Sequence, residues 1–157
     1  MTPSPPAAEL TDVAATPTAV IRGVVPLAEL APFFDRSFTA LAAVTAAQDV
    51  AITGPAFARY HGAPGATADL EVGFPTSRPI ESAGEASAGE LPACRAARLV
   101  HVGSYDDLGA SWGRLADWMR EQGLTPAPSF WEVYVTEPSP TMDPAGLRTE
   151  LIWPVAG

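Results

Sequence analysis

Lysine is absent from this 157-residue sequence, and all nine of its basic residues are arginines. They stand against 18 Asp and Glu residues, so the formal net charge at pH 7 is −9. A chain with this charge is repelled by nucleic-acid phosphates and by anionic lipid headgroups. The composition therefore argues against a protein that binds nucleic acid or a membrane surface.

Cysteine is almost absent as well, since Cys94 is the only one. One thiol excludes an internal disulfide and cannot form a thiolate metal cluster by itself, so we interpret Cys94 as a buried, inert side chain. The sequence also lacks the run of roughly 18 apolar residues that a membrane helix needs. Residues 1–8 have no positively charged region followed by the apolar stretch of a secretory signal. We therefore expect a cytoplasmic protein.

Sequence signals for metals, nucleotides and dinucleotides are missing too. There is no phosphate-binding Gly-Lys-Ser or Gly-Lys-Thr loop, and no Gly-x-Gly-x-x-Gly follows a predicted strand. His61 and His101 lie about forty residues apart, with no Cys or acidic partner at the spacing of metal ligands. We expect neither a metal site nor a cofactor.

The length fits one domain. Residues 1–18 are rich in Pro, Ala and Thr, a composition that buries too little apolar surface to offset the entropy lost on ordering. We therefore predict a disordered tail over residues 1–18 and a single folded domain over residues 19–157.

The first half of this domain has the pattern of a β-α-β-β unit. The β-branched segment Ala19–Val25 predicts a strand, and Pro26 suits the first turn of a helix. Apolar residues at three- and four-residue steps, Phe34 and Phe38 among them, form one stripe and predict that this helix spans about Leu27–Ala47. Two further strands, Val50–His61 and Ala66–Pro75, are separated by a turn rich in Gly and Pro.

The second half repeats this order of elements after a predicted loop over residues 78–90. Residues 93–102 predict a strand, and a helix follows from about residue 103 to Gly123, which suits a helix C-terminus. The segments Ser129–Thr136 and Leu147–Val155 predict the last two strands. The sequence therefore predicts an α+β fold built as a pseudo-symmetric duplication of two β-α-β-β units, with antiparallel sheets and two helices on one side.

One acidic residue stands out among aromatic ones. Strand alternation places Phe130, Glu132 and Tyr134 on one face and Trp131 and Val133 on the other. An ionised Glu between two aromatic side chains is costly unless it is paired or meets a cationic ligand. Glu132 is therefore a candidate functional group; the alternative is an edge strand whose Glu132 faces water.

Five fragments in order and spacing resemble the GyrI-like small-molecule-binding family over roughly residues 19–155. They are Gly54-Pro55-Ala56-Phe57-Ala58-Arg59-Tyr60-His61, Asp69-Leu70-Glu71-Val72-Gly73-Phe74-Pro75, Leu91-Pro92-Ala93 with His101-Val102-Gly103-Ser104-Tyr105-Asp106-Asp107-Leu108, Trp131-Glu132-Val133-Tyr134 and Ile152-Trp153-Pro154-Val155. The resemblance implies the same paired β-α-β-β units, also used as the effector-binding domain of multidrug-sensing transcription activators. It further implies a pocket for lipophilic, often cationic compounds.

The resemblance also implies which residues form the site. The buried acid that meets cationic ligands in this family falls on Glu132. The candidate ligand-binding residues are Glu132, Tyr134, Phe130, Tyr105, Trp112, Phe57 and Trp153. For each of the aromatic residues, packing in the core is the alternative interpretation.

Two functions follow from this resemblance. The first is a stand-alone protein that encloses a lipophilic molecule, with a protein partner or a homodimer left open. The second is a hydrolase of reactive cyclopropane-containing natural products, in which Glu132 directs water and Tyr134 or Tyr105 donates a hydrogen bond to the developing oxygen. A remote likeness of fold to the SOUL haem proteins suggests haem binding as a third, but neither His61 nor His101 has a clear place in a pocket.

Overall fold

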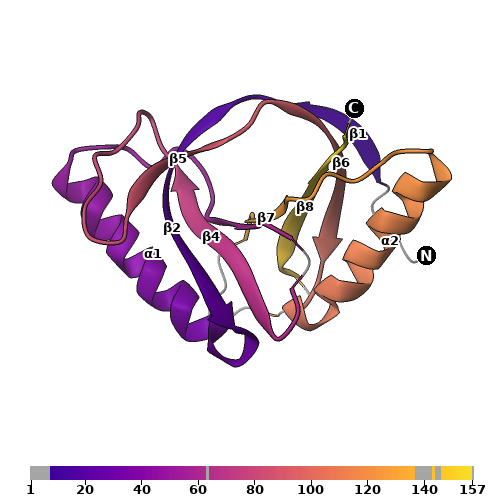
Figure 1. The fold of residues 1–157 in the computed structure, drawn as a ribbon, viewed down its shortest axis with the longest axis horizontal. Helices are drawn as coiled ribbons and strands as arrows, with labels where there is room; N and C mark the ends of the chain where they lie inside the picture. The colour runs from indigo at the N-terminus through magenta and orange to yellow at the C-terminus, as the bar shows by residue number, and fades with distance from the viewer. Residues whose placement is uncertain (1–7, 63, 137–142, 144–145, 157) are drawn as a thin grey trace.

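The computed structural model describes residues 8–62, 64–136, 143 and 146–156. Within these ranges, eight strands form one antiparallel sheet, and two α-helices pack against it (Figure 1). The order of the strands across the sheet is β1-β6-β8-β7-β3-β4-β2-β5.

The first half of the chain is a β-α-β-β unit, as predicted. Its elements are β2 (Thr16–Pro26), the short 3-10 helix η1 (Leu27–Glu29), α1 (Leu30–Ala47), β3 (Phe57–Tyr60) and β4 (Thr67–Pro75). The predicted helix began at residue 27, but residues 27–29 form a tighter 3-10 turn, a common form of a helix N-terminus.

The second half contains the same elements in the same order. They are β6 (Cys94–Val102), the 3-10 helix η2 (Tyr105–Asp107), α2 (Leu108–Glu121), β7 (Phe130–Tyr134) and β8 (Arg148–Pro154). In each unit the last strand lies between the first and the second strand, and the two units meet where β3 pairs with β7, with Ala58 opposite Glu132. The predicted α+β duplication is confirmed.

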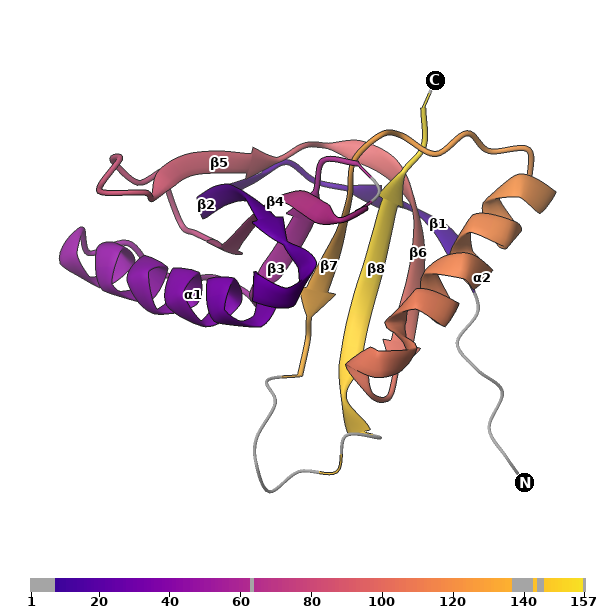
Figure 2. The same cartoon turned by 60° about the horizontal axis from the view of Figure 1, so that its bottom comes forward.

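Both helices cover the same face of the sheet. One row of directly opposed residues crosses both units and consists of Leu99, Leu151, Glu132, Ala58, Val72 and Ile21. Ala58 and Val72 belong to the core that packs on α1, and Leu99 and Leu151 belong to the core that packs on α2. Figure 2 shows the two helices flanking the sheet, with β3, β7 and β8 between them. Glu132 therefore lies on the helix-bearing face, at the junction of the two units.

Two strands lie where the sequence predicted none. β1 (Glu9–Val13) pairs with β6, and β5 (Ser87–Leu91) pairs with β2. The prediction of a disordered tail over residues 1–18 is therefore wrong for residues 9–13 and 16–18, and the predicted loop over residues 78–90 is wrong at its end. Residues 1–7 lie outside the described ranges. Pairing of the main chain orders these segments, since few of their side chains are buried.

The face of the sheet opposite the helices has its own hydrophobic core. Trp131 and Phe57 are almost completely buried there, together with Ile152 and Val20. Burying an aromatic side chain of this size stabilises the fold by about 1.5–3 kcal/mol. No helix in the described part of the chain has both the length and the hydropathy needed to cross a membrane.

Candidate functional site

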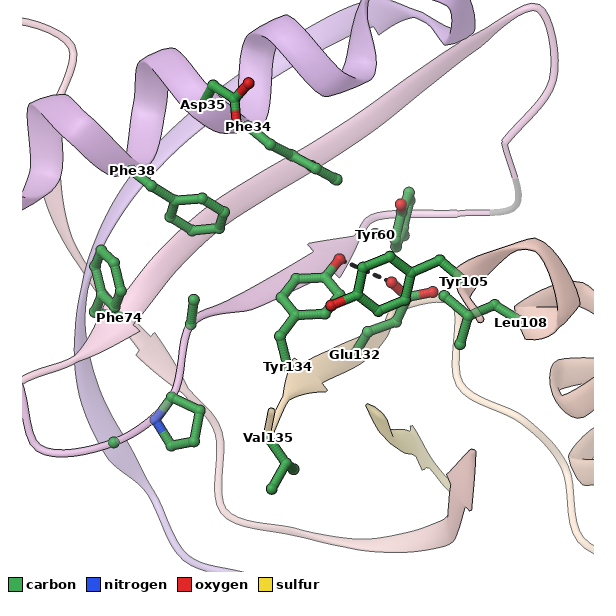
Figure 3. Close-up of a pocket in the computed structure, with 13 residues that line it drawn as sticks. Phe34, Asp35, Phe38, Tyr60, Phe74, Tyr105, Leu108, Glu132, Tyr134 and Val135 are labelled. Carbon is green, nitrogen blue, oxygen red and sulfur yellow. Dashed lines mark hydrogen bonds between the residues drawn. The ribbon is translucent and has the colours of Figure 1, made fainter. Parts of the chain in front are cut away.

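A cavity of about 880 Å³ opens on the helix-bearing face, where the two units meet (Figure 3). Its walls come from α1, from η2 with the start of α2, and from β3, β4 and β7. The residues that line it are Phe34, Asp35, Phe38, Gly54, Pro55, Ala56, Tyr60, Phe74, Tyr105, Leu108, Glu132, Tyr134 and Val135. A volume of this size accommodates a drug-sized molecule.

Aromatic rings form much of the wall. Phe38 of α1 packs against Phe74 of β4, with ring centroids 5.3 Å apart, and Phe34 packs against Tyr134 at 6.4 Å. Tyr105 of η2 meets the edge of Tyr134 at 5.9 Å. The rings thus surround the cavity from both units, and their faces carry the negative quadrupole that attracts cations.

Glu132 is the buried polar group of this cavity, with 7% of its surface exposed. The indole Nε1 of Trp112 donates a hydrogen bond to Oε1 at 2.9 Å, and the hydroxyl of Tyr134 donates one to Oε2 at 2.9 Å. Each carboxylate oxygen therefore has one fixed donor. Figure 3 shows the carboxylate of Glu132 beside the rings of Tyr134 and Tyr105. The alternative of a solvent-facing Glu132 on an edge strand is wrong, because β7 lies between β3 and β8.

The electrostatics of the site depend on this burial. Desolvation raises the pKa of Glu132, and the hydrogen bonds from Trp112 and Tyr134, with the nearby His101, partly oppose that rise. Burial, and then the charge of Glu132, raise the pKa of Tyr134 and of Tyr105, so both phenols remain protonated donors at neutral pH. Among the described residues that line the cavity, Asp35 and Glu132 are acidic and none is basic. Its field therefore favours a cationic guest.

The structure brings only some of the predicted site residues to the cavity. Glu132, Tyr134 and Tyr105 line it. Phe130, Trp112 and Trp153 instead form a cluster of aromatic rings beside it, with centroids 4.8–5.5 Å apart, and are not among the lining residues.

Phe57 is placed on the wrong side by the sequence prediction. It packs on the opposite face of the sheet with Trp131, because it lies an odd number of residues from Tyr60 along β3.

Four aromatic lining residues were missed by the prediction: Phe34, Phe38, Tyr60 and Phe74. Phe34 and Phe38 did belong to the predicted apolar stripe of the first helix, so that stripe was the available signal.

Ser111 lies in a Gly109-Ala110-Ser111-Trp112-Gly113 segment, which has the Gly-x-Ser-x-Gly spacing of a hydrolase nucleophile. Its Oγ is 2.6 Å from Nδ1 of His101, whose Nε2 donates to the carbonyl of Ser104 at 2.8 Å. A nucleophile elbow stands in a sharp turn between a strand and a helix, with its hydroxyl exposed. Ser111 is instead inside α2, 1% exposed and not among the lining residues. We therefore assign this pair to the packing of α2 on the sheet.

The histidines have other partners than a metal. His61 contacts Glu71, with Nε2 3.2 Å from Oε1. His101 forms a hydrogen bond with Ser111 of the same β-α-β-β unit. Among the described residues, no group of three His, Cys, Asp or Glu side chains is arranged to hold a metal ion. Neither His lines the cavity, so the geometry gives the haem alternative no support.

Comparison with protein families gives one match over almost the whole chain. The model of the GyrI-like small molecule binding domain matches residues 7–156. No curated protein matches the sequence.

Solved structures share the fold at low sequence identity. The EcmrR C-terminal domain is 20% identical with a TM-score of 0.85, over 96% of this chain and 98% of that one. In EcmrR bound to DNA, the similarity, at 22% identity and a TM-score of 0.85, spans 96% of this chain but only 57% of that longer chain. A hydrolase encoded by lin2189 from Listeria innocua is 12% identical, with a TM-score of 0.71 over 95% and 91% of the two chains. SAV2435, solved with tetraphenylphosphonium, is 11% identical, with a TM-score of 0.68 over 96% and 94%.

Proposed function

The chain belongs to the GyrI-like small-molecule-binding family, and from this premise we propose that it encloses a lipophilic cation, with Glu132 as the counter-charge. The observation that carries the proposal is a buried carboxylate that accepts a hydrogen bond at each oxygen, in a cavity walled by aromatic rings and, within the described part of the chain, lined by no basic residue.

The physical argument starts from the cost of the buried charge. An ionised carboxylate away from water is unfavourable unless an opposite charge or several donors compensate it. Trp112 and Tyr134 supply two neutral donors but no positive charge. The buried carboxylate of Glu132 can therefore gain stabilisation from a cation that enters the cavity.

The rest of the cavity favours an apolar guest. Aromatic faces attract a cation by roughly 0.5–2 kcal/mol per ring, and more when water is excluded. A small inorganic ion would leave the walls formed by Phe34, Phe38 and Phe74 uncovered, whereas an aryl cation would cover them. Tetraphenylphosphonium, which is bound in the SAV2435 structure, is a suitable probe of this class.

We expect the binding of tetraphenylphosphonium to depend on pH, because Glu132 has a raised pKa. The carboxylate is charged only above that pKa, so affinity should be constant at higher pH. Below it, affinity should fall about tenfold for each pH unit as the protonated acid ceases to offer a counter-charge. Isothermal titration calorimetry between pH 4 and 8 measures this dependence.

Triphenylphosphine oxide is the neutral control for this titration, since it presents similar rings without a net charge. Its affinity should change little over the same pH range. Equal pH dependence for the two compounds, or no binding of the cation at any pH, would contradict the proposal.

A second candidate function is hydrolysis at the same site. The specific observation is that Trp112 and Tyr134 fix the orientation of the Glu132 carboxylate, as a general base requires. Glu132 would take a proton from water, the hydroxide would attack a strained ring carbon, and the electron pair of the breaking ring bond would move to a conjugated carbonyl oxygen of the substrate, which would then take up the proton from Glu132. Tyr105 would donate a hydrogen bond to the developing oxygen, or Tyr134 would do so after turning its one O–H away from Glu132. The fold likeness to the Listeria innocua hydrolase fits this candidate.

Mass spectrometry separates the two candidates. Incubation with a cyclopropane-containing lipophile should leave its mass unchanged if the protein only binds it. Addition of one water to the compound, at a rate above that of a blank without protein, would instead assign the hydrolase.

We further propose that this domain acts in the cytoplasm and contacts no nucleic acid through its own surface. The charge of −9 supports the second point. The EcmrR chain in the DNA complex is longer than the part that resembles this domain. A protein partner, or a second copy of this chain, is compatible with the proposed binding of a small molecule.

A further inference from the structure

Helix α2 is tied to the sheet through two consecutive residues. Ser111 contacts His101 of β6, and Trp112 donates from its indole to Glu132 of β7. The hydroxyl of Ser111 also accepts a hydrogen bond from Arg114 at 2.7 Å. These polar contacts fix both the rotation of α2 and its position along the sheet, in a way that apolar packing alone would not.

The ring of Trp112 packs against neighbouring aromatic rings and does not line the cavity. It meets Phe130 edge-on with centroids 4.8 Å apart and Trp153 edge-on at 5.5 Å. Trp112 is half-buried and is not among the residues that line the cavity. Direct contact with a ligand is therefore not what this residue provides.

The indole of Trp112 instead forms a hydrogen bond with the Glu132 carboxylate from outside the cavity wall. Tyr134 donates to Oε2 from within the cavity wall, whereas Trp112 donates to Oε1 from outside it. We propose that Trp112 is a positioning residue: its N–H fixes the plane of the Glu132 carboxylate and favours the ionised form that faces the cavity. This inference rests on the proposed function of Glu132.

Several groups besides Trp112 act on Glu132. Tyr134 faces it from β7 itself, Tyr60 from β3, Tyr105 from η2 and His101 from β6. Asp35 of α1 lines the same cavity. Burial raises the pKa of the three phenols, so they stay protonated over the experimental range, whereas a change in the charge of another carboxyl or imidazole group would also alter the binding of a cation. The readout must therefore be specific to the Glu132 carboxyl.

The test compares Trp112→Phe with Trp153→Phe. Both changes remove one indole N–H from the same aromatic cluster, but Trp153 donates to the carbonyl of Ala127 rather than to Glu132. Trp112→Phe should raise the pH at which tetraphenylphosphonium binding is lost by about one pH unit or more, the worth of a hydrogen bond to a charged group. Trp153→Phe should leave that pH unchanged.

A ligand-free readout separates this inference from the proposed function. The ¹³C resonance of the Glu132 carboxyl, followed by NMR against pH, should titrate at a higher pH in Trp112→Phe and at the unchanged pH in Trp153→Phe. If this holds while tetraphenylphosphonium does not bind, the positioning role stands and the proposed function fails. Identical titration of Glu132 in the wild-type protein and in Trp112→Phe would overturn the inference.

The wild-type protein alone supplies a second measurement if Trp112→Phe does not fold. The indole Hε1 resonance of Trp112 should move as Glu132 titrates, because the acceptor changes from a carboxylate to a carboxylic acid. The Hε1 resonance of Trp153 should not follow that titration. A Trp112 resonance that is independent of the Glu132 titration would count against the positioning role.

Discussion

Replacing Trp131 by Ala is expected to lower the free energy of unfolding by about 3–5 kcal/mol, the usual cost of truncating a buried aromatic side chain. Trp131 is 2% exposed and packs with Phe57 and Ile152, and the guanidinium of Arg59 lies over its ring, 5.8 Å from the centroid. Truncation leaves a cavity in the core that joins both units. For a chain of this length the melting temperature should fall by roughly 6–20 °C.

Urea denaturation of the ligand-free protein measures this loss. Val24→Ala is the control, because Val24 is 67% exposed and its truncation should change the free energy of unfolding by no more than about 0.5 kcal/mol. A loss below about 1 kcal/mol for Trp131→Ala would mean that the face opposite the helices is not a close-packed core.

Trp131 and the adjacent Glu132 illustrate what the sequence could predict. Alternation along a strand assigns neighbouring residues to opposite faces, so the separation of Trp131 from Glu132 follows from the pattern alone. The duplicated order of elements could likewise be read from the sequence, because apolar periodicity changes from two residues to nearly four at each helix.

The set of cavity residues could not be predicted in the same way. Phe57 and Tyr60 lie on the same short strand, and only the register with β4 and β7 decides which of them faces the helices. On α1, the buried positions include Phe33 and Leu41, whereas Phe34 and Phe38 line the cavity. A stripe of apolar residues does not reveal which of its edges meets the core and which meets a cavity.

The sequence analysis missed strand β1 for a different reason. Segment Glu9–Val13 has no strong apolar pattern, and it is ordered by main-chain pairing with β6 and by an ion pair between Glu9 and Arg98. Such contacts between residues distant in sequence have no local signal. Composition alone therefore favoured a disordered tail.

Replacing Glu132 by Gln is expected to weaken the binding of tetraphenylphosphonium by roughly 10- to 150-fold. This range corresponds to about 1.5–3 kcal/mol, the worth of an interaction with a charged group. Gln keeps the shape of the side chain: its carbonyl can accept from Trp112, and its amide can donate to the hydroxyl of Tyr134. The substitution therefore removes the charge and leaves the packing of the cavity in place.

The ligand-free variant should be at least as stable as the wild-type protein at neutral pH. The folded state raises the pKa of Glu132 and so holds the proton more tightly than the unfolded state. The stability that Glu132 contributes is therefore fully present below its pKa in the unfolded state. It is lost as the pH rises through its pKa in the folded state. A neutral Gln does not pay this desolvation cost, so weaker binding cannot be attributed to a damaged fold.

The most direct measurement is a calorimetric titration of tetraphenylphosphonium and of triphenylphosphine oxide into the wild-type protein and into Glu132→Gln, at one pH above the pKa of Glu132. A binding site built around the charge of Glu132 predicts that the variant loses roughly 10- to 150-fold in affinity for the cation and less than about threefold for the neutral compound. Equal losses for the two compounds would show that Glu132 has a structural role, and unchanged affinity for the cation would place its binding site elsewhere.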